Sequence, residues 1–179
     1  MQTVKMVVTG PFNAGKTAFI KTVSEIDVVS TERKITKESE KVKDTTTVAM
    51  DFGRITIDED LVLYLFGTPG QRRFDFMWEI LSEGMLGFIV MVDSCRPETF
   101  REARSILETF RAYAPTPYIV AANKQDLKDA WELEDMRIAL RLDSTVKLLP
   151  CIATDKESVK TILLELLYQI LQEMEDRAT

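Results

Sequence analysis

The chain has 179 residues, a formal net charge of −6, no histidine and two cysteines. Its length predicts a single domain, residues 1–179, with a substantial core. The acidic balance argues against binding to nucleic acid or to an anionic membrane. The lack of histidine excludes a serine–histidine triad, a histidine general base and any histidine–metal site. Cys95 and Cys151 lie far apart and outside any C-x-x-C pattern, so we expect two buried free thiols.

Apolar runs alternate with segments of helical period along the chain. The runs predict six strands, at 4–9, 48–57, 61–66, 87–92, 118–122 and 148–152, and the periodic segments predict helices at about 16–26, 100–110, 133–140 and 159–174. This alternation predicts an α/β fold with a doubly wound, mostly parallel six-stranded sheet. An acidic turn at 58–60 joins the second and third strands, which predicts one antiparallel edge strand. Thr154 and Glu157 fit a capping box at the start of the last helix.

The first loop of this pattern carries a phosphate-binding motif. Residues 10–17, GPFNAGKT, match G-x-x-x-x-G-K-[ST] between a predicted strand and a predicted helix, which is the context that the motif requires. Backbone N–H groups of such a loop wrap a phosphate at the positive end of the helix dipole. Lys16 would place a charge on the β- and γ-phosphates, and the Thr17 hydroxyl can ligate Mg²⁺.

The segment 31–44, TERKITKESEKVKD, breaks the alternation because it is highly charged and almost free of apolar residues. A solvated surface loop and a mobile functional segment both fit this composition. Its position between the phosphate loop and a threonine-rich strand start favours the second interpretation.

A second motif, Asn123-Lys124-Gln125-Asp126, follows the predicted strand YIVAA. The carboxylate of Asp126 could accept hydrogen bonds from the N1–H and N2–H₂ groups of guanine, whereas adenine has no donors at that edge. The aliphatic stem of Lys124 could lie along the plane of the base. The four-residue pattern is weak alone, but its occurrence together with the phosphate loop is strong evidence for a guanine nucleotide site.

Taken together, these motifs resemble those of a small Ras-like GTPase, and the resemblance covers nearly the whole chain. It implies a P-loop NTPase fold, bound GTP or GDP with Mg²⁺, and Lys16 and Gln71 as catalytic residues. It also implies that Thr47, from the run Thr45–Thr47, is the switch I threonine that ligates Mg²⁺ together with Thr17. The Ala153 N–H would meet guanine O6. The implied nucleotide-binding residues are Gly10, Asn13, Ala14, Gly15, Lys16, Thr17, Ala18, Thr47, Gly70, Asn123, Lys124, Asp126, Ala153 and Thr154.

The segments TTTVAMDFGRI and LFGTPGQRRF resemble a prokaryotic branch of the superfamily, whose GTPases pair with roadblock-type proteins. Two residues depart from the usual family pattern. Gly67 replaces the aspartate that begins the D-x-x-G motif and holds Mg²⁺ through a water, so we expect weaker metal retention unless a carboxylate such as Asp44 or Asp93 substitutes. Phe12 is bulky at a position near the γ-phosphate, where it could crowd an arginine finger.

The resulting expectation is a GTP-binding molecular switch whose Gln71 orients water for slow hydrolysis, at about 10⁻⁴ to 10⁻² s⁻¹. The alternatives are a GTP-binding interaction module with little or no hydrolysis and, opposed by the guanine motif, a phosphate-loop ATPase or kinase. We expect a protein effector or regulator as partner and a cytoplasmic location. Gln2 replaces the glycine needed for myristoylation, and the tail lacks a prenylation cysteine, so no direct membrane anchor is expected.

Overall fold

The computed structural model describes residues 1–39, 42–69 and 75–179, and for 29–39 and 42–49 it describes the backbone alone. Along the chain the elements are β1 (Gln2–Thr9), α1 (Lys16–Val23), β2 (Val29–Ser39), β3 (Val42–Asp58), β4 (Leu61–Gly67), α2 (Asp75–Ser82), β5 (Gly87–Asp93), a 3₁₀ turn (Pro97–Thr99), α3 (Phe100–Tyr113), β6 (Tyr118–Asn123), α4 (Leu133–Ala139), β7 (Lys147–Cys151) and α5 (Lys156–Ala178).

The strands form one sheet in the order β2-β3-β4-β1-β5-β6-β7. The pairings β4–β1, β1–β5, β5–β6 and β6–β7 are parallel, whereas β2–β3 and β3–β4 are antiparallel. The α/β, doubly wound, mostly parallel fold predicted from the sequence is confirmed, and each predicted strand is present. β2 adds a seventh strand, which lies at the sheet edge beside the antiparallel strand that the acidic turn predicted.

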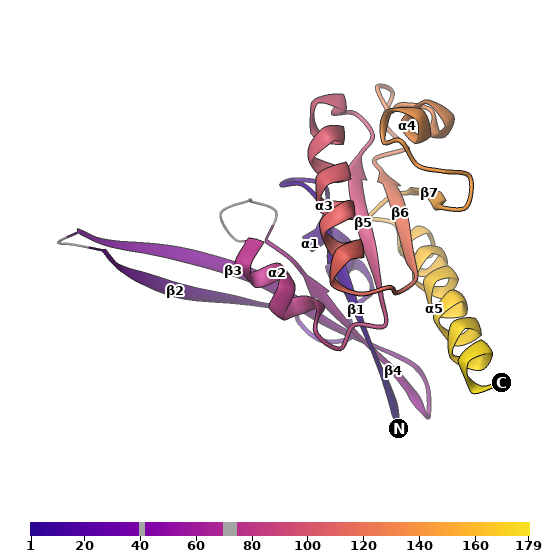
Figure 1. The fold of residues 1–179 in the computed structure, drawn as a ribbon, viewed down its shortest axis with the longest axis horizontal. Coiled ribbons are helices and arrows are strands. Elements are labelled where there is room, and N and C mark those ends of the chain that lie inside the picture. The colour runs from indigo at the N-terminus through magenta and orange to yellow at the C-terminus, as the bar shows by residue number, and fades with distance from the viewer. Residues whose placement is uncertain (40–41, 70–74) are drawn as a thin grey trace.

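The charged segment 31–44 is the part of the fold that the sequence misjudged. Most of it lies in β2 and in the first residues of β3, and these strands pair in register from Val29↔Phe52 to Ser39↔Val42. β3 pairs with β4 only from Asp51 onward. The outer part of β3 and β2 therefore form a long two-stranded arm that projects from the body of the sheet (Figure 1).

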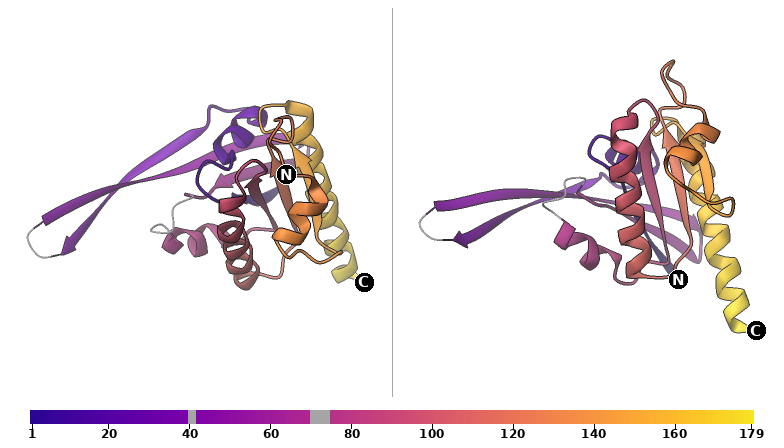
Figure 2. Two further views of the ribbon diagram at one scale, coloured as in Figure 1. Left: turned by 90° about the horizontal axis from the view of Figure 1, so that it is seen from above. Right: turned by 45° about the horizontal axis from the view of Figure 1, so that its top comes forward.

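Helices cover both faces of the sheet (Figure 2). α1 and α5 pack with Val4, Met6 and Val8 of β1 in one apolar core, and α3 packs with Val7 in a second core on the opposite face. The alternation along β1 thus serves two cores, as expected for a strand buried between two layers of helices.

Two smaller predictions can be compared with the structure. Cys151 is buried and Cys95 is half-buried, and both are free thiols. The predicted capping box at Thr154 is wrong, because α5 is capped by Asp155, whose carboxylate accepts a hydrogen bond from Ser158 N at 3.1 Å. Over the described part of the chain, no helix combines the length and the apolar character that crossing a bilayer requires.

Candidate functional site

The predicted residues of the phosphate loop and of the guanine motif gather at the carboxyl ends of the parallel strands. β1 runs into the phosphate loop at Thr9, β6 ends at Asn123, and β7 ends shortly before Ala153. The chain continues from β1 toward β3 and β4 on one side, and then crosses to β5, β6 and β7 on the other. A change of winding direction of this kind is where open α/β sheets bind their ligands.

The backbone of the phosphate loop requires glycine at two positions, Gly10 and Gly15. Gly10 has φ +144°, and a Cβ there would lie 2.3 Å from the carbonyl oxygen of Met91. Gly15 has φ +107°, and a Cβ there would lie 2.2 Å from Nδ2 of Asn123. Asn13 also has positive φ, at 64°. The loop therefore sits against β5 and β6, and it leads into the amino end of α1, where free N–H groups favour an anion.

Lys16 begins α1 and folds back over the loop. Its ammonium donates hydrogen bonds to the carbonyl oxygens of Gly10, at 2.6 Å, and Pro11, at 2.7 Å. The side chain is buried, and this burial lowers the pKa of Lys16 to about 8, although the Glu102 and Asp51 carboxylates act in the opposite direction. A phosphate in the loop would supply the negative charge that the buried ammonium needs.

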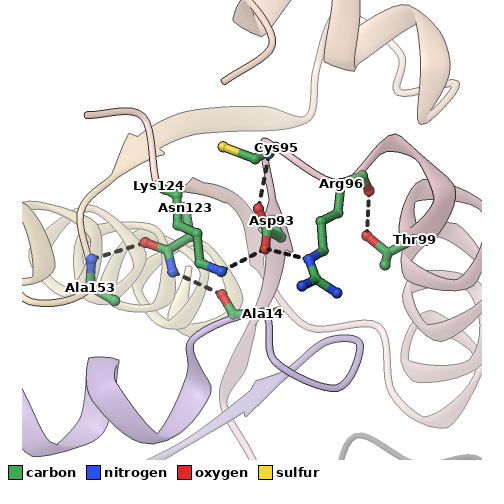
Figure 3. Close-up of polar contacts among 8 residues, drawn as sticks. All are labelled: Ala14, Asp93, Cys95, Arg96, Thr99, Asn123, Lys124 and Ala153. Carbon is green, nitrogen blue, oxygen red and sulfur yellow. Dashed lines mark hydrogen bonds and ion pairs between the residues drawn. The ribbon is translucent and has the colours of Figure 1, made fainter. Parts of the chain in front are cut away.

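Asn123 joins three segments that are far apart in the sequence (Figure 3). Its Nδ2 donates to the Ala14 carbonyl oxygen at 2.8 Å, and its Oδ1 accepts from the Ala153 N–H at 2.9 Å. The side chain is buried, so both bonds hold the loops in fixed relative positions. The Ala153 N–H is thus already engaged in this structure, and it would have to share or exchange that bond to meet guanine O6.

Lys124 is held in place by Asp93, the last residue of β5 (Figure 3). The Lys124 ammonium donates to Oδ2 of Asp93 at 2.7 Å, the Cys95 N–H donates to Oδ1 at 2.9 Å, and Nε of Arg96 lies 3.8 Å from Oδ2. Asp93 was a candidate for the substitute metal carboxylate. Its contacts with Lys124, Cys95 and Arg96 instead orient the segment that begins with Lys124.

The remaining residues of the guanine motif lie at the surface. Asp126 and Thr154 are exposed, whereas Gln125 is tied down, because its Nε2 donates to Oγ of Ser94 at 2.7 Å. Asp126 is therefore accessible to a base lying over Lys124.

At the other end of the site, Thr17 contacts a residue that the sequence did not single out. The Thr17 hydroxyl donates to Oδ2 of Asp51 at 2.5 Å. Thr17 is exposed, and Ala18 beside it is half-buried. A hydroxyl and a carboxylate side by side are ligand types that Mg²⁺ uses together with phosphate oxygens. No group of three or more acidic or cysteine side chains forms a metal centre within the described residues.

The structure does not bring Thr47 to this site. Thr47 lies in β3 opposite Lys34, and strand geometry separates its Cα from that of Asp51 by about 13 Å. Its side chain, like those of Thr45, Thr46 and Asp44, is outside the description. Gly70 and Gln71 lie outside the described residues altogether.

The start of the switch II segment is fixed up to position 69. The buried Thr68 hydroxyl donates to Oγ1 of Thr9 at 2.8 Å, and Nε1 of Trp78 donates to the Pro69 carbonyl oxygen at 3.0 Å. Sequence reasoning missed the contacts of Asp51 and Trp78. The available signal for Asp51 was that Gly67 replaces the family aspartate, so that another carboxylate could take its place. Asp51 is identified only by the β3–β4 register, which places it opposite Gly67.

A phosphate loop at the switch point of a Ras-like sheet defines a P-loop nucleotide-binding protein. Comparison with known proteins agrees: a family model described as "Conserved hypothetical ATP binding protein" matches residues 26–173, a range that begins after the phosphate loop. The chain belongs to that family and to the Ras-like superfamily of nucleotide-binding small GTPases.

Individual relatives point to the same superfamily. The chain is 33% identical to an uncharacterized protein of Methanocaldococcus jannaschii over 126 residues, which is 70% of this chain and 73% of the relative. It is 30% identical over 141 residues to ADP-ribosylation factor-like protein 9 of Homo sapiens, covering 77% of this chain and 67% of the relative. It is 27% identical over 135 residues to ADP-ribosylation factor-like protein 3 of Saccharomyces cerevisiae, covering 74% of this chain and 65% of the relative, which is just under two thirds.

Proposed function

We propose that this protein is a guanine-nucleotide switch that binds GTP with Mg²⁺ and hydrolyses it slowly to GDP and phosphate. The observation that carries the proposal is the pair of hydrogen bonds made by Asn123. They connect the phosphate loop to the segments that carry Asp126 and Ala153. One nucleotide could therefore contact the phosphate loop with its phosphates and the Asp126 carboxylate with its base. The description of the matched family as ATP-binding comes from a model that begins at residue 26.

The choice of base is the first thing to test. Replacing Asp126 by Asn removes the carboxylate charge that two guanine donors would use, and each charged hydrogen bond contributes about 1.5–3 kcal/mol. We expect GDP affinity to fall by roughly 10²-fold or more. Asp129→Asn is the matched control, because Asp129 is an exposed aspartate three positions beyond the motif, and it should bind GDP as the parent does.

Competition of GDP against ADP for the parent protein completes this experiment. GDP should displace a fluorescent guanine nucleotide at far lower concentration than ADP. Equal competition by ADP would show that the site does not select guanine, and an Asp126→Asn variant with unchanged GDP affinity would show that Asp126 does not recognise the base.

Hydrolysis would use few groups of the chain. Lys16 and the loop amides would stabilise charge on the β- and γ-phosphates, and Gln71 would orient the attacking water. A bound Mg²⁺ would act as a Lewis acid and template, with Thr17 and, in the switched state, Thr47 as ligands. We expect a hydrolysis rate constant of about 10⁻⁴ to 10⁻² s⁻¹ without a partner.

The second candidate function is a GTP-binding interaction module with little or no hydrolysis. The exposure of Phe12, a phosphate-loop residue that is 59% accessible, favours it, because a bulky ring there obstructs a catalytic group supplied by a partner. Single-turnover phosphate release separates the two functions. A switch predicts slow release that Gln71→Ala reduces at least tenfold, whereas a module predicts equally negligible release from both proteins.

Switching requires the arm to rearrange. For Thr47 to ligate a metal at Thr17, residues 42–49 must give up their register with β2, because that register holds Thr47 about 13 Å along the strand from Asp51. Hydrogen exchange should therefore show faster exchange in the arm with a non-hydrolysable GTP analogue than with GDP. Identical exchange in both states would refute this part of the proposal.

The partner is proposed on chemistry and resemblance. The segments TTTVAMDFGRI and LFGTPGQRRF resemble those of roadblock-associated GTPases. A cytoplasmic pull-down with GDP- and GTP-analogue-loaded protein should recover a roadblock-type protein selectively with one nucleotide. Recovery that does not depend on the nucleotide would argue against a switch partner.

A further inference from the structure

The missing aspartate at position 67 leaves a space that another residue of the chain fills. Gly67 ends β4 and pairs with Asp51 of the neighbouring antiparallel strand. A Cβ built on Gly67 would lie 3.2 Å from Cβ of Asp51 and 3.5 Å from its Oδ2. The carboxylate of Asp51 thus lies over the backbone of Gly67, where a side chain from that position would begin.

The same carboxylate lies next to the end of the phosphate loop. Oδ2 of Asp51 accepts the hydrogen bond from the Thr17 hydroxyl at 2.5 Å. The negative charge of Asp51 also raises the pKa of the buried Lys16 ammonium. The Asp51 carboxylate therefore acts on two consecutive residues of the chain, Lys16 and Thr17. These contacts put one negative group beside the hydroxyl that is the metal ligand in the proposed function.

We propose that Asp51 supplies the carboxylate of the Mg²⁺ site, from β3 instead of from the start of switch II. The proposal rests on the proposed function, since the metal would arrive with the nucleotide phosphates. The chain would contribute Thr17 and Asp51, and phosphate oxygens and water would complete the shell, a donor set that Mg²⁺ commonly takes. Metal retention would then equal that of relatives with the aspartate, despite Gly67.

The structure favours Asp51 over Asp93, one of the two carboxylates considered from the sequence. Asp93 is buried and bonded to Lys124 and to the Cys95 N–H, so using it for a metal would dismantle the guanine segment. The carboxylate of Asp51, in contrast, already lies at the phosphate loop, where it accepts the hydrogen bond from the Thr17 hydroxyl.

Three variants test the assignment through metal binding, with no reliance on hydrolysis. The measurement is the Mg²⁺ concentration that half-maximally slows dissociation of a fluorescent GDP analogue. Asp51→Asn keeps the side-chain shape and an acceptor for Thr17 but removes the charge, and we expect the midpoint to rise by about 10- to 100-fold. Asp58→Asn, an exposed aspartate at the far end of β3, is the matched control and should leave it unchanged.

The exchange variant Asp51→Gly/Gly67→Asp moves the carboxylate to the family position. The contacts of the new Cβ with Asp51 disappear in this variant, and the remaining one, at 2.9 Å, is with the flexible end of Ile20. We expect the midpoint to return to within about threefold of the parent.

The outcomes separate the two levels of the proposal. A parent protein that binds no guanine nucleotide, or binds it without any effect of Mg²⁺, refutes the proposed function. Mg²⁺-dependent binding in the parent with an unchanged midpoint in Asp51→Asn refutes the role of Asp51 alone. An exchange variant that melts like Asp51→Asn but does not recover the midpoint refutes it as well.

Discussion

The burial of Lys16 makes nucleotide binding dependent on pH in a way that can be calculated. Burial lowers the pKa of this ammonium to about 8. Phosphate oxygens placed against it would stabilise the charged form and restore a pKa near the ordinary value of about 10.4. Between these two values the complex holds a proton that the free protein has lost, so binding takes up protons.

The magnitude follows from the two pKa values. At about pH 8 the free ammonium is half charged, so binding should take up about half a proton, rising to about 0.9 at pH 9. Affinity should weaken as the pH rises, by about fivefold between pH 8 and pH 9. Nucleotide phosphates, whose second pKa is about 6, are fully ionised in this range and contribute little.

Calorimetric titration of nucleotide-free protein with GDP gives the proton number directly. The observed heat is measured in buffers of different ionisation enthalpy at about pH 8, near the lowered pKa of Lys16. Lys5→Met is the matched control, because the pKa of Lys5 is also lowered by burial, but its ammonium contacts the Glu83 carbonyl oxygen. The control should take up the same fraction of a proton as the parent. Proton release, or no uptake, would refute the argument from burial.

Three further changes test the packing around the site. Asn123→Ala leaves two buried backbone groups without their partner, and the free energy of unfolding should fall by about 2–4 kcal/mol in urea denaturation. Gly15→Ala places a Cβ against Asn123 at positive φ, so nucleotide affinity should be lost while circular dichroism still shows a folded sheet. Trp78→Phe removes the indole hydrogen bond to Pro69 and should cost about 1 kcal/mol in thermal unfolding; no change would mean that this bond does not hold the segment.

The core of the fold was predictable because its signals are local. Strands such as β5, GFIVMVD, are buried on both faces and are mostly continuous apolar runs in the sequence. The phosphate loop was predictable for the same reason, since its residues are consecutive. β2 was not predictable in this way. Its sequence, VSTERKITKES, is mostly polar, and backbone pairing with β3 defines it as a strand.

The site was predictable only where its members belong to motifs. Asp93 illustrates the limit, because the sequence shows an aspartate at a strand end but not that it faces Lys124. Asp51 illustrates it further, since its meaning depends on lying opposite Gly67 in the adjacent strand. Such a pairing depends on the sheet register, because a shift of one residue would turn the side chains of the strand to the opposite face of the sheet.

The position of Asp51 gives the arm a direct connection to the site. Asp51 is the first residue of β3 that pairs with β4, and the residues before it pair with β2 alone. It therefore stands where the arm leaves the body of the sheet. A carboxylate at position 67 would stay with β4 whatever the arm does, whereas one at position 51 shares its strand with Thr47. Any movement of the arm must pivot close to Asp51, and for that reason the grip on a metal at Thr17 and the conformation of the arm should change together.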